Sequence, residues 1–357
     1  MIKALTRNRH RRMTTFTLAA LLVASLSVAC WAQSTKADDV KLHGAGSTFA
    51  APLIKRWIDE YRVAHRNVTI SYDAVGSGEG VKRFTAEDVD FADSDDILTD
   101  SEISKVRNGA IMVPVTAGMI VLAYNIPGVE SEIKLPRDVL IDIFAGKIRK
   151  WDDPRILAAN AGVEFPHRDI AVVARQDSSG TTAAFTHHLA TISQAWSGMG
   201  MGVGKLINWP KGTMLASGND GVAGRIKISE GSIGYVEYWF AQRLGLRMAA
   251  IQNKSGAFIT PTAHAGQLAL SGRVARVKEL DASVADPADK GAYPITTYSW
   301  VLLYSRYMDQ TKGKAIRDFV EWGLSQQSQN YGEQLGYIPL SADVTKLGRE
   351  AISAITQ

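Results

Sequence analysis

The sequence has one cysteine, Cys30, in a chain of 357 residues. A single cysteine excludes an intramolecular disulfide and any zinc or iron–sulfur site that needs several thiolates from one chain. Only 21% of the residues are charged, and 46% are hydrophobic. This balance is typical of a globular chain, not of a disordered, collagen-like or multi-span membrane protein. At this length we expect two domains with sizeable buried cores.

Acidic residues are absent from residues 1–32, which carry five basic side chains and an uncharged, mostly apolar run at Phe16–Ala29. A basic head, a short apolar stretch and a small residue, Ala32, before a polar stretch are the parts of a secretory signal peptide. The run is short for a membrane span. We therefore predict that residues 1–32 direct export and are removed. A retained anchor helix is one alternative, and a lipoprotein acylated at Cys30 is another.

The formal net charge of +4 depends on this same segment. Without its five positive charges, 35 basic and 36 acidic residues remain, which gives a net charge of about −1. A positive excess would favour a polyanionic partner. Because the exported chain lacks that excess, we expect no nucleic-acid partner.

Familiar catalytic and cofactor motifs are also missing. The chain contains no Gly-x-x-x-x-Gly-Lys-Ser/Thr loop, and Gly76–Gly80 lacks the Gly-x-x-Gly ending of a dinucleotide fingerprint. No serine is framed as Gly-x-Ser-x-Gly, and the histidines have no metal-binding spacing. We therefore expect no cofactor, no metal and no catalysis, because an enzyme would have to assemble its site from scattered residues.

From residue 40 onward, strand-like and helix-like patterns alternate, which predicts an α/β fold. The predicted strands are Val40–His43, Val68–Tyr72, Ile111–Val115, Met119–Tyr124, Ile170–Ala174, Ser232–Val236 and Tyr298–Tyr304. The predicted helices are Leu53–Tyr61, a segment after Gly76–Gly80, Arg137–Phe144, Thr181–Leu189 and Lys314–Leu324. No linker separates two domains, so we expect the chain to cross between two lobes more than once.

Three segments place Gly, Ser or Thr between a predicted strand and a predicted helix: Gly44–Phe49, Gly76–Gly80 and Arg175–Thr182. Free N–H groups and the helix dipole converge at such a junction, which suits an anion. Each segment alone is equally typical of an ordinary helix cap. Arg175 in the third segment adds a planar fork of donors for an oxyanion, and Asp177 is placed to hold it.

An acidic run extends from Asp90 to Asp100. It does not fit a calcium loop. When the loop pattern is started at Asp93, Ile97 stands at the fifth position, where a ligand is needed, and the required Gly is missing. A carboxylate near anion-binding loops has a use if the anion carries a proton, because the carboxylate then accepts a hydrogen bond from that O–H group. A fully ionised anion of similar size would instead be repelled.

These motifs resemble the phosphate-binding protein of the bacterial phosphate ABC importer, over a range from about residue 42 to residue 303. The main matching segments are Leu42–Phe49, Val75–Val81, Val89–Asp95 and Ala171–Thr181. Supporting segments are Ala123–Gly128, Ala145–Asp153, Gly218–Gly221 and Gly234–Tyr238.

The resemblance implies a periplasmic solute-binding protein of the two-lobed, type II-like architecture, with lobes joined by two crossing strands and the ligand in the cleft. It places one lobe at residues 36–117 plus 294–357 and the other at 118–293. It implies phosphate as ligand, importer permease subunits as partners, and a monomer. The implied phosphate-binding residues are Thr48, Phe49, Ser77, Asp95, Arg175, Ser179, Gly180 and Thr181, with Asp177 supporting Arg175 and Asp95 accepting the ligand's proton.

The sequence departs from that family at a few positions. Ser47 and Ala50 stand where the family often has Ala and Pro, and both changes are conservative in size. Glu79 stands where Gly is common and adds a negative charge near the site. Residues 191–218 match poorly. A secreted phosphatase that uses the same loops, or a receptor for another oxyanion or phosphonate, remains an alternative at this stage.

Overall fold

The strands form a nine-stranded sheet and a three-stranded sheet within the residues that the computed structural model describes, 39–272 and 284–355. In spatial order, the larger sheet runs β2 (Val68–Ala74), β1 (Val40–Gly46), β3 (Phe91–Ser94), β12 (Thr296–Tyr304), β4 (Ala110–Asn125), β8 (Ser232–Glu237), β6 (Ala171–Arg175) and β7 (Met214–Ala216), and β9 (Arg247–Met248) pairs with β4 outside this path. The smaller sheet runs β11 (Phe258–Ile259), β10 (Ala250–Gln252) and β5 (Lys134–Leu135).

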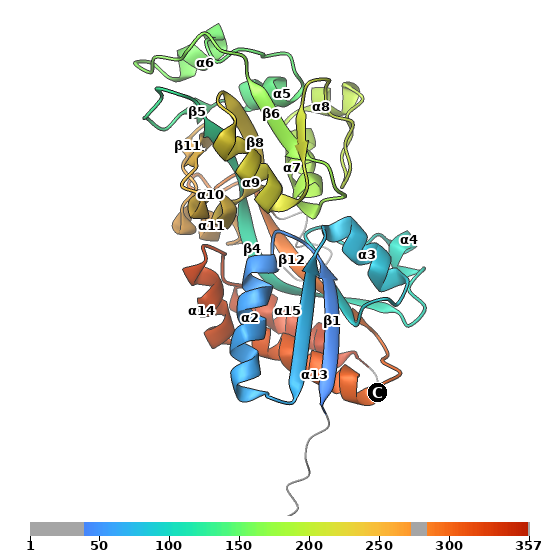
Figure 1. Ribbon diagram of the computed structural model, residues 1–357. Coiled ribbons are helices and arrows are strands. Elements are labelled where there is room, and N and C mark those ends of the chain that lie inside the picture. Colours follow the sequence, from blue (N-terminus) through green and yellow to red (C-terminus); the bar gives the residue numbers. More distant parts are fainter. Residues whose placement is uncertain (1–38, 273–283, 356–357) are drawn as a thin grey trace, which may run out of the picture. The chain divides into compact units, whose positions relative to one another are not determined.

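The larger sheet has two halves, which meet at β4 and β12 (Figure 1). β1 is parallel to β2 and β3 in one half, and β6 is parallel to β7 and β8 in the other. β4 pairs antiparallel with β12 along its first part and with β8 along its second part. The chain therefore builds two α/β lobes, which we call the first lobe (β1–β3) and the second lobe (β6–β8).

Helices cover the sheet in both lobes. Those of the first lobe are α2 (Ala51–Ala64), α3 (Ser77–Thr85), α4 (Asp100–Ile103), α13 (Gln310–Gly323), α14 (Gln326–Gln334) and α15 (Ala342–Ser353). Those of the second lobe are α5 (Arg137–Phe144), α6 (Pro154–Ala159), α7 (Gly180–Ile192), α8 (Gln194–Gly198), α9 (Gly218–Ile228), α10 (Tyr238–Arg243) and α11 (Ala263–Ala269). In α2, the side chains of Leu53, Trp57 and Tyr61 recur at helical spacing and are buried.

The predicted α/β alternation is confirmed, with one correction to the strands. The helix predicted at Arg137–Phe144 has these bounds in the structure. The segments Ile111–Val115 and Met119–Tyr124 are strand, as predicted, but the break predicted between them is wrong, because both belong to the single strand β4.

The pattern breaks in β4 because the strand contains a β-bulge. The register with β12 shifts between Ser299 and Trp300, so that Ser299 pairs with Thr116 and Trp300 with Pro114. A proline has no N–H to give to a ladder and is tolerated at a bulge. The carbonyl oxygen of the extra residue, Val115, accepts a hydrogen bond of 3.0 Å from Gln329 Nε2. Long-range pairing therefore continues a strand that local periodicity divides.

The predicted signal peptide at residues 1–32, including Cys30, lies outside the described residues. Of the helices that the structure describes, none is both long and apolar enough to cross a membrane.

Candidate functional site

The three segments predicted to bind an anion lie at three helix N-termini. β1 leads through Thr48 into α2, β2 leads through Gly76 into α3, and β6 ends at Arg175 shortly before α7. Gly76 has a φ of 92°, and a Cβ there would lie 2.5 Å from Asp177 Oδ2. Both the backbone conformation and the close approach of the second lobe therefore require glycine at this position.

Backbone donors are available at these helix starts. Neither α2 nor α3 has a side-chain cap, whereas Ser179 Oγ caps α7 by accepting from Thr182 N at 3.1 Å. The first N–H groups of a helix have no intrahelical acceptor. Within residues 39–272 and 284–355, the N–H groups of Thr48, Ser77, Gly180 and Thr181 have no hydrogen-bond acceptor.

Arg175 supplies a buried positive charge, since only 3% of its surface is exposed. Its Nε donates to Asp177 Oδ1 at 2.8 Å, its Nη2 pairs with Asp177 Oδ2, and its Nη1 donates to Thr181 Oγ1 at 3.4 Å. Burial alone would raise the pKa of Asp177, but Arg175 and the N–H of Gly218 hold it below its usual value. The predicted pairing of Arg175 with Asp177 is confirmed, and it fixes the guanidinium in one orientation.

Asp95 supplies a buried carboxylate from the first lobe, with 2% of its surface exposed. Its Oδ1 accepts from Ser47 Oγ and from Ser299 Oγ, both at 2.6 Å, and its Oδ2 accepts from Ser77 Oγ at 3.4 Å. Burial raises the pKa of Asp95 to about 6, although the serine donors and the charge of Arg175 oppose the rise. The titration of Asp95 is therefore moved from the acidic range of an exposed carboxyl group toward neutral pH.

The two lobes contact each other around these groups. Gly78 N donates to Ser178 O at 3.0 Å, and Asn219 Nδ2 donates to Thr48 Oγ1 at 3.0 Å. Thr48, Ser77 and Asp95 of the first lobe thus lie against the segment 175–181 of the second lobe.

Phe49 has a different position from the other predicted site residues. Its side chain is fully buried, its N–H donates to Ser47 Oγ at 2.9 Å, and its carbonyl oxygen accepts from Tyr337 Oη at 2.6 Å. The N–H of Phe49 therefore already has a partner within the first lobe.

The structure adds four residues that the sequence did not single out for this site: Ser47, Ser299, Asn219 and Lys205. Besides contacting Thr48, Asn219 Nδ2 donates to Thr181 Oγ1 at 3.2 Å, so one amide links residues from both lobes. The sequence signal for Asn219 is the segment 218–221, which resembles the family.

Lys205 lies in the stretch 191–218, which resembles the family poorly. Its Nζ is 3.0 Å from Asp96 Oδ2 and 3.5 Å from Glu102 Oε1, and both of these residues belong to the first lobe. The pKa of Lys205 is above its usual value because these carboxylates outweigh the effect of burial. This ion pair joins the two lobes beside the cluster of donors.

The charge of Glu79 is compensated on its own helix. Its carboxylate accepts from Arg83 Nε at 3.1 Å and from Lys82 Nζ at 3.3 Å. Hydrogen bonds from Arg83 and Lys82 hold the pKa of Glu79 below its usual value. The negative charge of Glu79 is therefore neutralised by two neighbouring cations of α3, Lys82 and Arg83.

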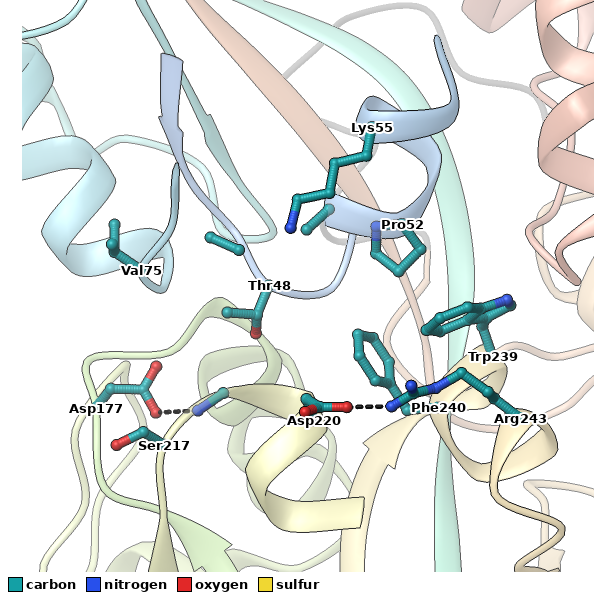
Figure 2. A pocket seen from close by; sticks show the side chains of 13 residues that line it. Thr48, Pro52, Lys55, Val75, Asp177, Ser217, Asp220, Trp239, Phe240 and Arg243 are labelled. Atoms are coloured by element: carbon teal, nitrogen blue, oxygen red, sulfur yellow. Dashed lines mark hydrogen bonds and ion pairs between the residues drawn. The ribbon is translucent and has the colours of Figure 1, made fainter. Parts of the chain in front are cut away.

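A pocket of about 530 Å³ lies beside the donor cluster and includes Thr48, Asp177 and Gly218 in its wall (Figure 2). Its other side is formed by Pro52, Trp239 and the Arg243–Asp220 ion pair. Arg175, Asp95 and Ser179 are buried and do not line this pocket.

Among the residues that the structure describes, no group of three or more His, Cys, Asp or Glu side chains is arranged to hold a metal ion. His188 is buried, and neither ring nitrogen has a hydrogen-bond partner within this part of the chain. Burial lowers the pKa of His188 to about 3.

The comparisons with known proteins agree with this geometry. The model of the PBP superfamily domain matches residues 32–327. The phosphate-binding protein PstS of Xylella fastidiosa (strain Temecula1) is 35% identical over 317 residues, which is 88% of this chain and 85% of that protein. The chain belongs to this family of PstS phosphate-binding proteins, within the PBP superfamily.

Other relatives extend the match. The PstS protein of Methanocaldococcus jannaschii is 34% identical over 343 residues, covering 90% of this chain and 88% of the relative. A solved high-affinity periplasmic phosphate-binding protein bound with phosphate superposes with a TM-score of 0.71 at 22% identity, over 87% of this chain and 93% of that one. A phosphate-binding protein from Stenotrophomonas maltophilia gives 0.67 at 21% identity over the same shares. These structures confirm the predicted two-lobed fold of periplasmic binding proteins.

Proposed function

We propose that this protein binds inorganic phosphate in the cell envelope and delivers it to the permease of an ABC importer, without catalysis. The observation that carries the proposal is the meeting of Arg175 and Asp95, both buried, at a cluster of N–H and O–H donors from two lobes. One fixed cation, many donors and a single acceptor match a tetrahedral oxyanion that still carries a proton. The names of the PstS relatives support the same ligand.

In this proposal, each group has one role. Thr48 and Ser77 donate through their N–H and hydroxyl groups. Phe49 donates through its N–H if that group exchanges its hydrogen bond to Ser47 Oγ for one to the ligand. Ser179, Gly180 and Thr181 donate from the start of α7. Arg175 forms the charge-assisted bonds, and Asp177 orients it. Asp95 accepts a hydrogen bond from the ligand's O–H group. Sulfate has no proton at neutral pH, so it would face the buried negative charge of Asp95 without a hydrogen bond.

In this proposal the ligand also stabilises the closed state of the two lobes. We place one lobe at residues 36–117 plus 294–357 and the other at 118–293. The ligand then contacts residues of both lobes and favours the closed state. The protein acts as a monomer in the periplasm after export through the segment 1–32. In this proposal the permease recognises the closed form.

Isothermal titration calorimetry with phosphate and with sulfate tests the ligand. We expect phosphate to bind at least about 100-fold more tightly than sulfate at neutral pH, because a buried carboxylate without a proton to accept costs about 3 kcal/mol. The Asp95→Asn variant should lose this preference. Equal affinities of the wild-type protein for the two anions would refute the role of Asp95.

The same preparation separates a receptor from an enzyme. A receptor releases no phosphate from an aryl phosphate, and bound phosphate is found when the purified protein is denatured. Release of phosphate from the aryl ester that disappears in Arg175→Gln would instead establish a phosphatase.

A further inference from the structure

A second buried carboxyl group, Asp93, lies on β3, two residues before Asp95, which directly follows the end of that strand. Asp93 is fully buried, and its Oδ2 has no hydrogen-bond partner among the described residues. Residues two apart on a strand point to the same face of the sheet. Asp93 and Asp95 therefore approach the same residue of the neighbouring strand β12, which is Ser299.

The Ser299 hydroxyl lies between the two carboxyl groups. Its Oγ is 2.7 Å from Asp93 Oδ1 and 2.6 Å from Asp95 Oδ1. A hydroxyl has one proton to donate and can accept at its lone pairs. Two ionised carboxylates cannot both accept from Ser299, so one of the two carboxyl groups must carry a proton and donate it to Ser299 Oγ.

The other contacts show which carboxyl group carries it. Asp95 accepts from Ser47 Oγ, whose own oxygen accepts from Phe49 N at 2.9 Å, so the Ser47 proton is committed to Asp95. Arg175 also favours the ionised form of Asp95. The carboxyl group of Asp93 has the Ser299 hydroxyl as its one hydrogen-bond partner in the described chain. Burial and the charge of Asp95 raise the pKa of Asp93 well above its usual value.

We propose that Asp93 is a positioning residue that stays protonated and donates to Ser299, which in turn donates to Asp95 Oδ1. Asp95 Oδ2, whose one partner is Ser77 Oγ at 3.4 Å, then has the remaining capacity to accept the ligand's proton. The series of donors then has one direction, from Asp93 through Ser299 to Asp95. The position of the proton is a property of the ligand-free protein, whereas its effect on the ligand rests on the proposed function. Asp93 itself touches no ligand.

Infrared difference spectroscopy of the ligand-free protein at neutral pH tests where the proton lies. We expect the carbonyl stretch of a protonated carboxylic acid to disappear in Asp93→Asn and to persist in Asp95→Asn. Glu237 is also buried with a raised pKa, but it is common to both variants and cancels. A band lost in Asp95→Asn alone, or in neither variant, overturns the assignment.

Phosphate titration tests the positioning effect. Asp93→Ala removes the donor to Ser299, and we expect phosphate to bind about tenfold more weakly, as for the loss of one oriented hydrogen bond to a charged group. Asp93→Asn places an amide N–H toward Ser299 Oγ and should recover most of that loss. If Asp93→Ala, shown by its thermal transition to be folded, binds as tightly as Asp93→Asn, the positioning role is wrong.

The two measurements keep this inference apart from the proposed function. A wild-type protein that binds no phosphate refutes the proposed function, and the infrared band still decides the position of the proton. A protein that binds phosphate but keeps the band in Asp93→Asn refutes the inference alone.

Discussion

Gly180 begins α7 at the point where the second lobe meets the first. A Cβ at this position would lie 2.5 Å from Ser77 Oγ and 2.9 Å from both Asp95 Cβ and Asp95 N. The backbone of Gly180 is not in the left-handed region, so alanine fits it without strain. Because Gly180 lies on one lobe and Ser77 on the other, the added methyl group overlaps its neighbours only when the cleft is as narrow as in this structure.

The size of the effect of Gly180→Ala follows from these distances. Ordinary contact begins near 3.4 Å, so the cleft would have to stay open by about 1 Å. Overpacking of this kind costs about 1–3 kcal/mol, which corresponds to a phosphate dissociation constant about 5- to 150-fold higher. In an open, ligand-free protein the methyl group would have no such neighbour. There the substitution should raise the free energy of unfolding by about 0.4–1 kcal/mol, because alanine restricts the unfolded chain.

Calorimetry with phosphate and thermal unfolding without ligand measure the two effects separately. Gly224 in α9 gives a matched control, because a Cβ there meets nothing within 4 Å. Gly224→Ala should stabilise the ligand-free protein in a similar way and leave the phosphate affinity unchanged. If Gly180→Ala binds phosphate as tightly as the wild-type protein, then the cleft does not close to the width seen here. If it melts at a lower temperature than wild type without ligand, the overlap is a packing defect and not a feature of closure.

Three further predictions concern charges. Because the pKa of Asp95 is raised to about 6, phosphate affinity should fall between pH 7 and pH 5 while sulfate affinity rises, and calorimetry that shows parallel changes for both anions would contradict this. Lys205→Met should weaken phosphate binding about threefold to tenfold by removing an ion pair between the lobes, and this loss of affinity should be smaller at high salt. As a control, Lys211→Met should leave the affinity unchanged, because Lys211 is exposed and has no ion pair in the described chain. His188 has a folded-state pKa of about 3 against an ordinary value of 6.5, so below pH 6.5 the unfolded chain binds a proton that the folded chain does not, and the free energy of unfolding decreases as the pH is lowered. His188→Leu should reduce this decrease in urea unfolding between pH 7 and pH 4, and an unchanged pH dependence would refute the assignment.

The sequence predicted those features that depend on neighbouring residues. The helix at Arg137–Phe144 and the three strand-to-helix junctions could be read locally, because apolar periodicity and Gly or Ser at a helix start act within a few residues. The pairing of Arg175 with Asp177 belongs to the same class, since the two residues are two positions apart. Strand β4 was divided in error because its bulge is defined only by pairing with β12.

The partners of Asp95 show why the rest of the site could not be predicted. Ser299 lies 204 positions away along the chain, and Ser47 lies 48 positions away. No local sequence pattern predicts such a contact for a serine, and the similar size of serine and alanine says nothing about the hydroxyl group of Ser47. In the structure its hydroxyl donates to the Asp95 carboxylate, so its polarity is what matters.

The pairing of charges explains how the site can hold an anion without an excess of positive charge around it. Arg175 is matched by Asp177, Glu79 by Arg83, and Lys205 by Asp96, so the formal charges around the donor cluster largely cancel in pairs. Long-range attraction is therefore small, and the attraction that remains comes from N–H and O–H dipoles held at fixed positions, which act over short distances. Such dipoles distinguish ligands by where protons lie and not by total charge. A buried carboxylate is therefore compatible with the proposed anion site, and in our proposal the position of one proton, on Asp93 or on Asp95, decides which anion fits.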